Sequence, residues 1–379
     1  MNAEPFDALV IGAGVAGAAF ASQVTLTGRR VLLIERSAWP RSKVCGCCLN
    51  NAALQPLRRL GLGPTLTTTA APLDRLTLRA RSRTAQLTVS GGLALSRALL
   101  DDLLVQRAVS LGTDFRPGTT AALSRPDPSG GWSVRLRTAT GEHTVTAPLV
   151  AAADGLAGTS LTSLQPFQPV VSPHAWFGVG GTLSGPVPGC GRGEVAMHIA
   201  ARGYAGLVRL DDRTVNLAAA LDPAWTKSVG GPARAVNAVI TDAGGEPLHF
   251  HDADLRGTRP LTRRRSRVSA PGLLVLGDAA GYIEPFTGEG MAWALAGAEA
   301  AAGLVNAGLG GRALADAWAD WHAVNVRARQ RTCSVMRQLL RRPRLVGCII
   351  AAINTLPAAA RAAAALARRV ERPYPGTAA

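Results

Sequence analysis

A set of three glycines near the start of the chain has the spacing of a pyrophosphate-binding turn. They are Gly12, Gly14 and Gly17. An apolar run over residues 6–11 precedes them and a segment of small residues follows, which predicts a strand and then a helix. These glycines allow a tight turn and close approach of the backbone to a phosphate. A second apolar run, residues 30–34, ends at Glu35, whose carboxylate can accept a hydrogen bond from a ribose hydroxyl. The pattern predicts dinucleotide binding.

A carboxylate beside a glycine also ends two later apolar runs, over residues 149–153 and 273–276. The pairs are Asp154 with Gly155 and Gly277 with Asp278. A parallel strand that ends this way places a carboxylate at the edge of the sheet where ligands bind. The chain then passes Pro285 and enters a predicted helix at Gly288 to Gly290. The free N–H groups and positive end of that helix suit a partly anionic cofactor, although an ordinary strand, loop and helix shows the same pattern.

The segments between these motifs indicate a second sheet. Residues 71–90 alternate apolar and polar side chains, and residues 166–257 do so between Gly and Pro turns. Both patterns predict antiparallel strands. Ser96 is placed to cap a helix that runs to about residue 111, with Arg97 in its first turn. The tail from residue 313 onwards is predicted to be mostly helical.

The charge of the chain is strongly positive, at +16, from 41 Lys and Arg against 25 Asp and Glu. Nearly all of the positive charge is arginine, because the only lysines are Lys43 and Lys227. Such a charge suits an anionic partner, and an ordinary arginine-rich surface explains it equally well. We expect a small-molecule or lipid substrate and no nucleic acid, and the oligomeric state stays open.

The six cysteines show neither CxxC pairing nor a zinc-type spacing with histidine. His249 and His251 alternate on a predicted strand, where surface polarity explains them better than a metal site, so we expect no bound metal. Free thiols are typical of a reducing cytosol.

The sequence has no uninterrupted run of about 20 apolar residues, so we expect no helix that spans a membrane. The basic and apolar segment over residues 337–350 predicts a helix that rests on an anionic membrane or packs on the protein's own surface. We therefore expect a cytoplasmic protein, with peripheral contact at the inner membrane face left open.

Four segments together resemble a known group of flavoproteins. They are the glycine turn with Glu35 and Arg36, the loop PRSKVCG over residues 40–46, the Asp154-Gly155 pair, and GDAAGYIEPFTGEGMAWAL over residues 277–295. In order and spacing they are similar to the FAD-dependent oxidoreductases of the glutathione reductase-like superfamily, and most of all to the geranylgeranyl reductase group. The resemblance covers residues 8–310.

The resemblance implies an α/β fold, with a discontinuous Rossmann-like FAD-binding domain and an interleaved α+β substrate domain of mainly antiparallel sheet. The FAD-binding domain would comprise residues 1–70, 93–160 and 268–312. The substrate domain would comprise residues 71–92 and 161–267, and residues 313–379 would form a C-terminal helical region.

The resemblance also implies roles for single residues. The glycine turn would hold the ADP part of FAD, Glu35 the adenosine ribose, and Asp278 the ribityl chain. Arg97 would lie beside the pyrophosphate. Cys45 matches a cysteine in a loop that lines the flavin, where it donates a proton, positions the substrate, or is a small residue that fits. The predicted cofactor-binding residues are Gly12, Gly14, Gly17, Glu35, Arg36, Gly46, Arg97, Asp154, Gly155, Gly277, Asp278, Pro285, Gly288 and Gly290.

The reaction implied is reduction of carbon-carbon double bonds in an isoprenoid, lipid or secondary metabolite, with electrons from NAD(P)H or a separate donor. One alternative is an FAD-dependent monooxygenase that hydroxylates an aromatic or polyketide substrate with O2 and NAD(P)H. Another is a flavin-bearing regulatory or anionic-lipid-binding protein. Residues 203–209 lack the aromatic motif common in these reductases, and Gly281 stands where aromatic hydroxylases usually have histidine.

Overall fold

A six-stranded sheet is the centre of the fold, in the order β18-β19-β10-β1-β2-β6. The computed structural model describes residues 6–126, 131–284, 286 and 288–370. The strands from β19 to β6 are parallel, and the residues of β1, β2, β10 and β19 are buried. Parallel strands covered on both faces are continuous apolar runs, which is why the sequence predicts them. The strands are β1 (Ala8–Ile11), β2 (Val31–Ile34), β6 (Asp114–Arg116), β10 (Leu149–Ala152), β18 (Ser269–Ala270) and β19 (Leu273–Val275).

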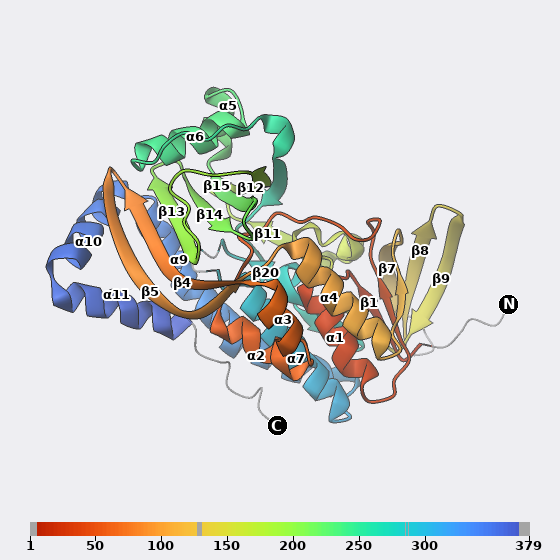
Figure 1. The fold of residues 1–379 in the computed structure, drawn as a ribbon. Coiled ribbons are helices and arrows are strands. Elements are labelled where there is room, and N and C mark those ends of the chain that lie inside the picture. Colours follow the sequence, from red (N-terminus) through yellow and green to blue (C-terminus); the bar gives the residue numbers. More distant parts are fainter. Residues whose placement is uncertain (1–5, 127–130, 285, 287, 371–379) are drawn as a thin grey trace.

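Helices rich in small residues pack beside this sheet (Figure 1). Helix α1 contacts both α4 and α7, and α2 contacts α7. Most residues of α1 are alanine, glycine, serine or valine and are buried, so neighbouring elements can approach its backbone closely. These helices are α1 (Val15–Thr25), α2 (Asn51–Arg59), α4 (Arg97–Ser110) and α7 (Gly290–Asn306).

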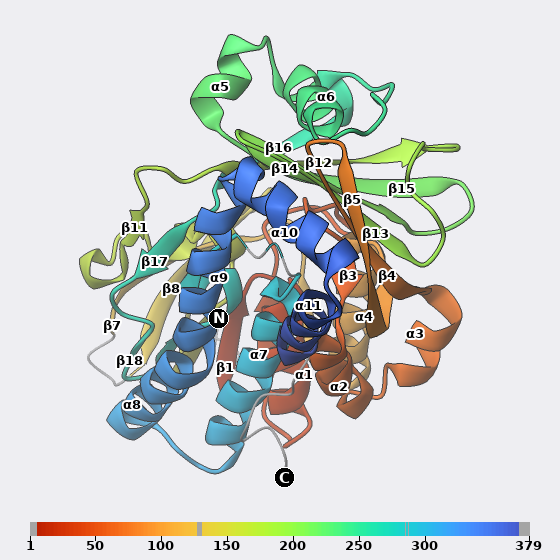
Figure 2. The same cartoon turned by 90° about the vertical axis from the view of Figure 1, so that its left-hand side faces the viewer.

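An eight-stranded sheet forms a second layer, in the order β16-β12-β15-β14-β13-β4-β5-β3. Helices α5 and α6 lie over its outer face, and α10 and α11 contact β5 (Figure 2). Apolar side chains of α6 pack on β13 and β14. The strands are β3 (Cys48–Leu49), β4 (Ala71–Ala80), β5 (Arg83–Ala94), β12 (Phe177–Ser184), β13 (Glu194–Ala200), β14 (Gly203–Arg209), β15 (Thr214–Leu221) and β16 (Arg256–Pro260). The helices are α5 (Pro223–Ser228), α6 (Pro232–Asp242), α10 (Pro343–Thr355) and α11 (Pro357–Val370).

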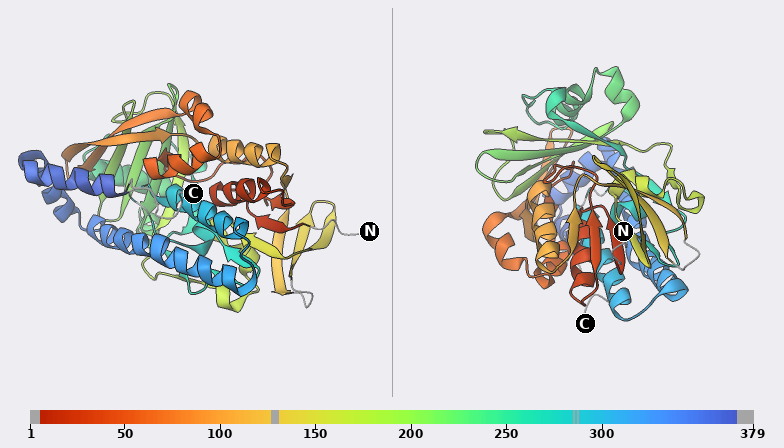
Figure 3. Two further views of the ribbon diagram at one scale, coloured as in Figure 1. Left: turned by 90° about the horizontal axis from the view of Figure 1, so that it is seen from below. Right: turned by 90° about the vertical axis from the view of Figure 1, so that its right-hand side faces the viewer.

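Two three-stranded sheets and further helices complete the described chain. In the left view of Figure 3, the yellow β7-β8-β9 sheet and the dark blue C-terminal helices lie at opposite ends of the molecule. The remaining strands are β7 (Thr120–Pro126), β8 (Trp132–Thr138), β9 (Gly141–Ala147), β11 (Pro169–Val171), β17 (Arg263–Arg265) and β20 (Gly281–Tyr282). The remaining helices are α3 (Gly63–Thr69), α8 (Gly311–His322), α9 (Ala328–Leu340), a π-helix (Ala323–Arg327) and the 3-10 turns Gly155–Ala157, Thr159–Leu161, Gln165–Phe167, Asp252–Asp254 and Gly277–Ala280.

The α/β fold class predicted from the sequence is confirmed. Helix α7 begins at Gly290, within the predicted start, and Gly288 precedes it with a φ of +73°. Two local predictions differ from the structure. His249 and His251 lie outside the strands, and α5 and α6 interrupt a segment predicted as strands and turns. Within the described chain, no single helix is long and apolar enough to cross a membrane, and one pair bent by 115° passes that test only when taken together.

Candidate active site

A cavity of about 760 Å³ is lined by both large sheets and by the loops between them. At one end it reaches the glycine turn after β1, and at the other it reaches β13, β14 and β15. All the described residues predicted to bind the cofactor line this cavity except Gly17, and Cys45 lines it as well. Pro285 lies outside the described residues. The size is within the usual range for cofactor and ligand sites.

The glycine turn is shaped by close backbone packing. Gly12 has a φ of +101°, and a Cβ there would lie 2.5 Å from the carbonyl oxygen of Ala153. A Cβ on Gly17 would overlap the carbonyl oxygen of Gly12, so Gly17 allows α1 to pack on the turn without lining the cavity. Gly14 is the N-cap of α1, at the positive end of that helix.

Positive side chains gather in front of this helix end. A Cβ built on Gly14 would lie 3.6 Å from Nη2 of Arg41, 3.8 Å from Nη2 of Arg97 and 4.0 Å from Nζ of Lys43. Burial and the neighbouring Arg97 lower the pKa of the Lys43 amine. Arg41 and Lys43 belong to the PRSKVCG loop, but no role was predicted for either residue from the sequence. The cluster and the helix end together suit a pyrophosphate.

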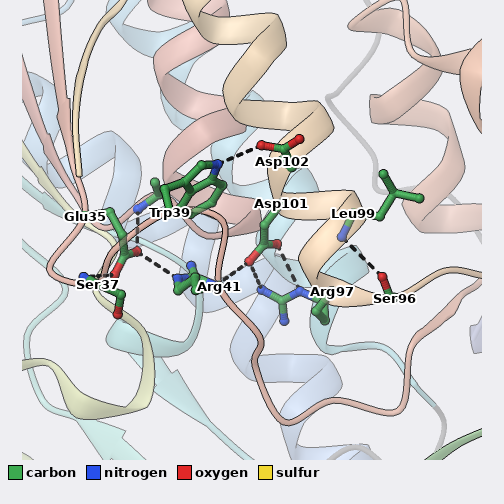
Figure 4. Close-up of polar contacts among 10 residues, drawn as sticks. Glu35, Ser37, Trp39, Arg41, Ser96, Arg97, Leu99, Asp101 and Asp102 are labelled. Atoms are coloured by element: carbon green, nitrogen blue, oxygen red, sulfur yellow. Dashed lines mark hydrogen bonds and ion pairs between the residues drawn. The ribbon is translucent and has the colours of Figure 1, made fainter. Parts of the chain in front are cut away.

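The cluster is held together by Asp101, which lies on α4 and is fully buried (Figure 4). Arg97 donates two hydrogen bonds to it, and Nη1 of Arg41 donates a third at 2.7 Å. Burial opposes ionisation of Asp101, but Arg97 and Arg41 outweigh it and lower the pKa of the carboxyl. Asp101 thereby neutralises part of the positive charge and orients the arginines.

Glu35 follows β2 directly and lies beside the glycine turn. Its carboxylate accepts from the backbone N–H of Ala13 at 3.3 Å and of Ser37 at 3.1 Å, and Nε of Arg41 lies 3.1 Å from Oε2 (Figure 4). A carboxylate has about four acceptor positions, so a ribose hydroxyl can still be bound. The arrangement agrees with the role that the resemblance implies for Glu35.

Cys45 lies in the cavity near Arg97. Hydrogen bonding with Cys47, whose backbone N–H lies 3.4 Å from Sγ of Cys45, and the charge of Arg97 outweigh burial and lower the pKa of Cys45 to about 6. The carbonyl oxygen of Cys45 accepts from Asn216 on β15, at 2.9 Å, a contact that nothing in the sequence indicates. Burial raises the pKa of the Cys48 thiol to about 12. Cys45, Cys47 and Cys48 form no disulfide. The pKa is lowered for Cys45 and raised for Cys47 and Cys48, so Cys45 is the one of the three that favours the thiolate.

The two Asp-Gly pairs lie differently. Asp278 lines the cavity, and Gly277, at a φ of +57°, packs against Ala16 of α1. Asp154 turns one carboxylate oxygen toward the backbone N–H of Ser160, at 2.8 Å, which helps to fix the loop after β10. Asp154 lines the cavity as well, and its other oxygen, Oδ1, has no hydrogen-bond partner among the described residues, so either carboxylate could bind a hydroxylated chain. Within the described residues, no group of three or more metal-ligating side chains is placed to hold an ion.

The glycine cradle, the cationic cluster at a helix end and the carboxylate after β2 fit the ADP part of FAD, and they define a dinucleotide-binding flavoprotein site. Residues 5–324 match the FAD binding domain family, and the chain belongs to this family.

Relatives differ in their described activities. The menaquinone reductase of Mycolicibacterium smegmatis is 26% identical over 80% of this chain and 76% of its own length. Conditioned medium factor receptor 1 of Dictyostelium discoideum is 23% identical over 78% of this chain, and the match spans 62% of that protein. Digeranylgeranylglycerophospholipid reductase 1 of Methanopyrus kandleri is 31% identical over 40% of each chain.

Solved structures show the same fold. The flavin-dependent brominase Bmp2 superposes with a TM-score of 0.79 at 16% identity, covering 97% of this chain and 94% of that one. PqsL of Pseudomonas aeruginosa, described as a probable FAD-dependent monooxygenase, superposes with a TM-score of 0.71 at 18% identity, covering 91% and 99%. At these identities the likeness concerns the fold alone.

Proposed function

We propose that this flavoenzyme reduces a carbon-carbon double bond in an isoprenoid, lipid or other apolar secondary metabolite. Bound FAD in its reduced form would supply the hydride. The observation that carries the proposal is the position of Cys45, where the cationic part of the cavity meets a part lined by apolar strands. A largely apolar substrate could lie on those strands with its reacting carbons near the thiol.

The chain's own residues would divide the work. Arg41, Lys43 and Arg97 would hold the pyrophosphate, and Glu35 the adenosine ribose. Asp278 would bind the ribityl hydroxyls. With its pKa lowered to about 6, Cys45 is mainly a thiolate at neutral pH, which supports positioning of the substrate over proton donation. Water or another acid in the cavity would then provide the proton.

The named relatives support the reductase. Two of them are described as reductases, of menaquinone and of a digeranylgeranyl phospholipid. We propose that the enzyme belongs to the geranylgeranyl reductase group. We also propose that it receives its electrons from NAD(P)H or from a separate protein.

A monooxygenase is the second candidate, and the likeness in fold to PqsL favours it. In that case reduced FAD would react with O2, and an aromatic or polyketide substrate would occupy the same apolar part of the cavity. The residues proposed to hold FAD would be the same in both candidates.

Peripheral membrane contact of a cytoplasmic protein is part of the proposal. On α10, Leu345 and Ile349 are 43% and 38% exposed, and Leu356, just after it, is 56% exposed. The exposed Arg342 and Arg344 lie at the start of the same helix. Apolar side chains beside arginine suit an anionic lipid surface. Sedimentation with anionic vesicles, but not with neutral ones, would support this contact.

The experiment for the proposed function is an anaerobic mixing assay. FAD-loaded protein is reduced chemically without O2 and mixed with menaquinone or with a digeranylgeranyl phospholipid, and the flavin spectrum is followed. Re-oxidation by the phospholipid supports the reductase. Re-oxidation by menaquinone does so only if the prenyl chain of the product has gained two hydrogen atoms, because the quinone ring can itself accept the electrons. If the flavin stays reduced until O2 is admitted, the monooxygenase is supported. Strong vesicle binding without any turnover would point to the regulatory or lipid-binding alternative.

A further inference from the structure

The part of the cavity beyond Cys45 is a chamber with an aliphatic and aromatic wall. Tyr204 on β14 and Phe286 line it and meet edge to face, with ring centroids 5.3 Å apart. The ring of Trp176 lies 6.2 Å from that of Tyr204. The other lining residues of this wall include Leu76, Val195, Met197 and Ala218. Such a wall binds apolar surface and offers little to a polar group.

Glu284 is a carboxyl beside this wall. It lines the cavity, is only 2% exposed, and lies two residues after the end of β20. Neither of its carboxylate oxygens has a hydrogen-bond partner among the described residues. A buried carboxyl without a partner is costly, so a site that retains one has a reason to bind a ligand that completes it.

Among the described residues, the charged neighbours of Glu284 form no hydrogen bond with its carboxylate. Nη2 of Arg341, which follows α9, is 4.0 Å from Oε1, too far for a hydrogen bond. The guanidinium of Arg341 instead donates to the carbonyl oxygen of His174 at 2.6 Å and lies 4.5 Å from the centre of the Trp176 ring. Arg337 on α9 adds a second positive charge that acts on Glu284.

The other titratable groups that face Glu284 are Tyr204 on β14 and Tyr282 on β20, and burial raises the pKa of both phenols. Cys333 on α9 faces Tyr204 in turn. Burial raises the pKa of Glu284 to about 7, against the opposing charges of Arg341 and Arg337. Near neutral pH the carboxyl is therefore partly protonated, and a protonated carboxyl has one O–H to donate.

We propose that Glu284, in its neutral form, is a specificity-determining residue that donates a hydrogen bond to a carbonyl oxygen of an otherwise apolar substrate, as in a quinone or an enone. This inference rests on the proposed function, because it assigns the chamber to the substrate. It narrows the substrate class to apolar molecules with a hydrogen-bond acceptor. A hydrocarbon of the same shape cannot accept a hydrogen bond from Glu284, so Glu284 would add nothing to its binding affinity.

The test is a binding measurement on oxidised, FAD-loaded protein, so no turnover is involved. The probe is 2,3-dimethyl-1,4-naphthoquinone, whose substituted ring does not add to the thiolate of Cys45. The matched hydrocarbon is 2,3-dimethylnaphthalene. Affinities are measured by calorimetry between pH 6 and pH 8.5. The variants are Glu284→Gln, which remains a neutral donor, and Glu284→Leu, which has no donor. Glu142→Gln, at an exposed site on β9, is the control.

For wild type, we expect the affinity for the quinone to fall about tenfold from pH 6 to pH 8, because the binding-competent neutral form becomes about tenfold rarer. Glu284→Gln should bind the quinone within about threefold of wild type at pH 6, with no pH dependence, since it keeps a single hydrogen bond. Glu284→Leu should lose about tenfold for the quinone and nothing for the hydrocarbon.

A pH-independent wild-type affinity, or the wild-type pH profile in Glu284→Gln, would overturn the inference. So would equal quinone affinity in Glu284→Leu and wild type. Retained FAD absorbance and melting temperature show that a variant is folded. If the proposed reductase activity fails while this binding pattern holds, the reaction is wrong and the role of Glu284 stands.

Discussion

Arg97 and Asp101 lie one turn apart on α4 and form two parallel hydrogen bonds, Nε to Oδ1 and Nη2 to Oδ2, each 3.0 Å long. Two-point pairing fixes the plane of a guanidinium. It holds Arg97 in the space that faces Gly14, where the cofactor's pyrophosphate is expected. Helix α4 is therefore part of the proposed cofactor site, although it carries no recognised motif.

Replacing Arg97 with alanine should weaken FAD binding about tenfold to a hundredfold, because one hydrogen bond to a charged group contributes about 1.5–3 kcal/mol. Fluorescence titration of FAD-free protein with FAD measures the affinity. Arg135→Ala removes an exposed arginine from β8 and should leave the affinity unchanged. An equal loss of FAD affinity in Arg97→Ala and Arg135→Ala would mean that FAD binding depends only on the net charge of the chain.

Removal of the helix cap at Ser96 should lower stability more than cofactor binding. Its Oγ accepts from the backbone N–H of Leu99 at 3.2 Å and caps α4 (Figure 4). Ser96→Ala should lower the free energy of unfolding by about 1 kcal/mol, and Ser96→Asp should retain most of it. Denaturant unfolding of both variants measures this. A loss in Ser96→Asp as large as in Ser96→Ala would contradict the capping role.

Filling the space before Gly14 should block the cofactor without unfolding the chain. The side chain of Gly14→Val would extend toward Arg41 and Arg97, where the pyrophosphate is expected. We expect FAD affinity to fall by at least about tenfold. Gly303→Ala is the matched control, because a Cβ there meets nothing within 4 Å and alanine favours a helix. Unchanged FAD binding in Gly14→Val would place the pyrophosphate elsewhere.

The thiol of Cys45 should react with iodoacetamide at unusually low pH. With its pKa lowered to about 6, the thiolate is present above that pH and is lost as the pH falls through it. Alkylation of Cys45 in FAD-free protein should therefore be half-maximal near pH 6, measured by mass spectrometry of the peptide. Arg97→Ala should move this midpoint upward, because a neighbouring positive charge is removed. A midpoint in the ordinary range for cysteine would contradict the described environment of Cys45.

The sequence predicted the parts of the fold that have a strong local signal. The continuous apolar runs of β1, β2 and β10, the cap at Ser96 and the alternation over β4 and β5 all appear in the structure. It missed α5 and α6, which are short and lie between strands, where local pattern and propensity conflict. It also missed β6, because three residues are too few for a period to be seen.

The parts of the candidate site that belong to a motif with fixed spacing could be predicted from the sequence. The contacts that folding makes between distant residues could not. The glycine turn, Glu35 and Asp278 could be identified from motifs. The contact of Asn216 with Cys45 joins residues 171 positions apart, and that of Arg41 with Asp101 joins residues 60 apart. Burial also determines the chemistry of Glu284, and one sequence does not show it.

The central claim is that electrons from this site go to carbon, and the mass of the product tests it most directly. FAD-loaded protein is reduced, supplied with an unsaturated polyprenyl substrate, and incubated with and without O2. We predict a product heavier by two hydrogen atoms that forms equally well without O2. A product heavier by one oxygen atom that forms only with O2 would contradict the claim.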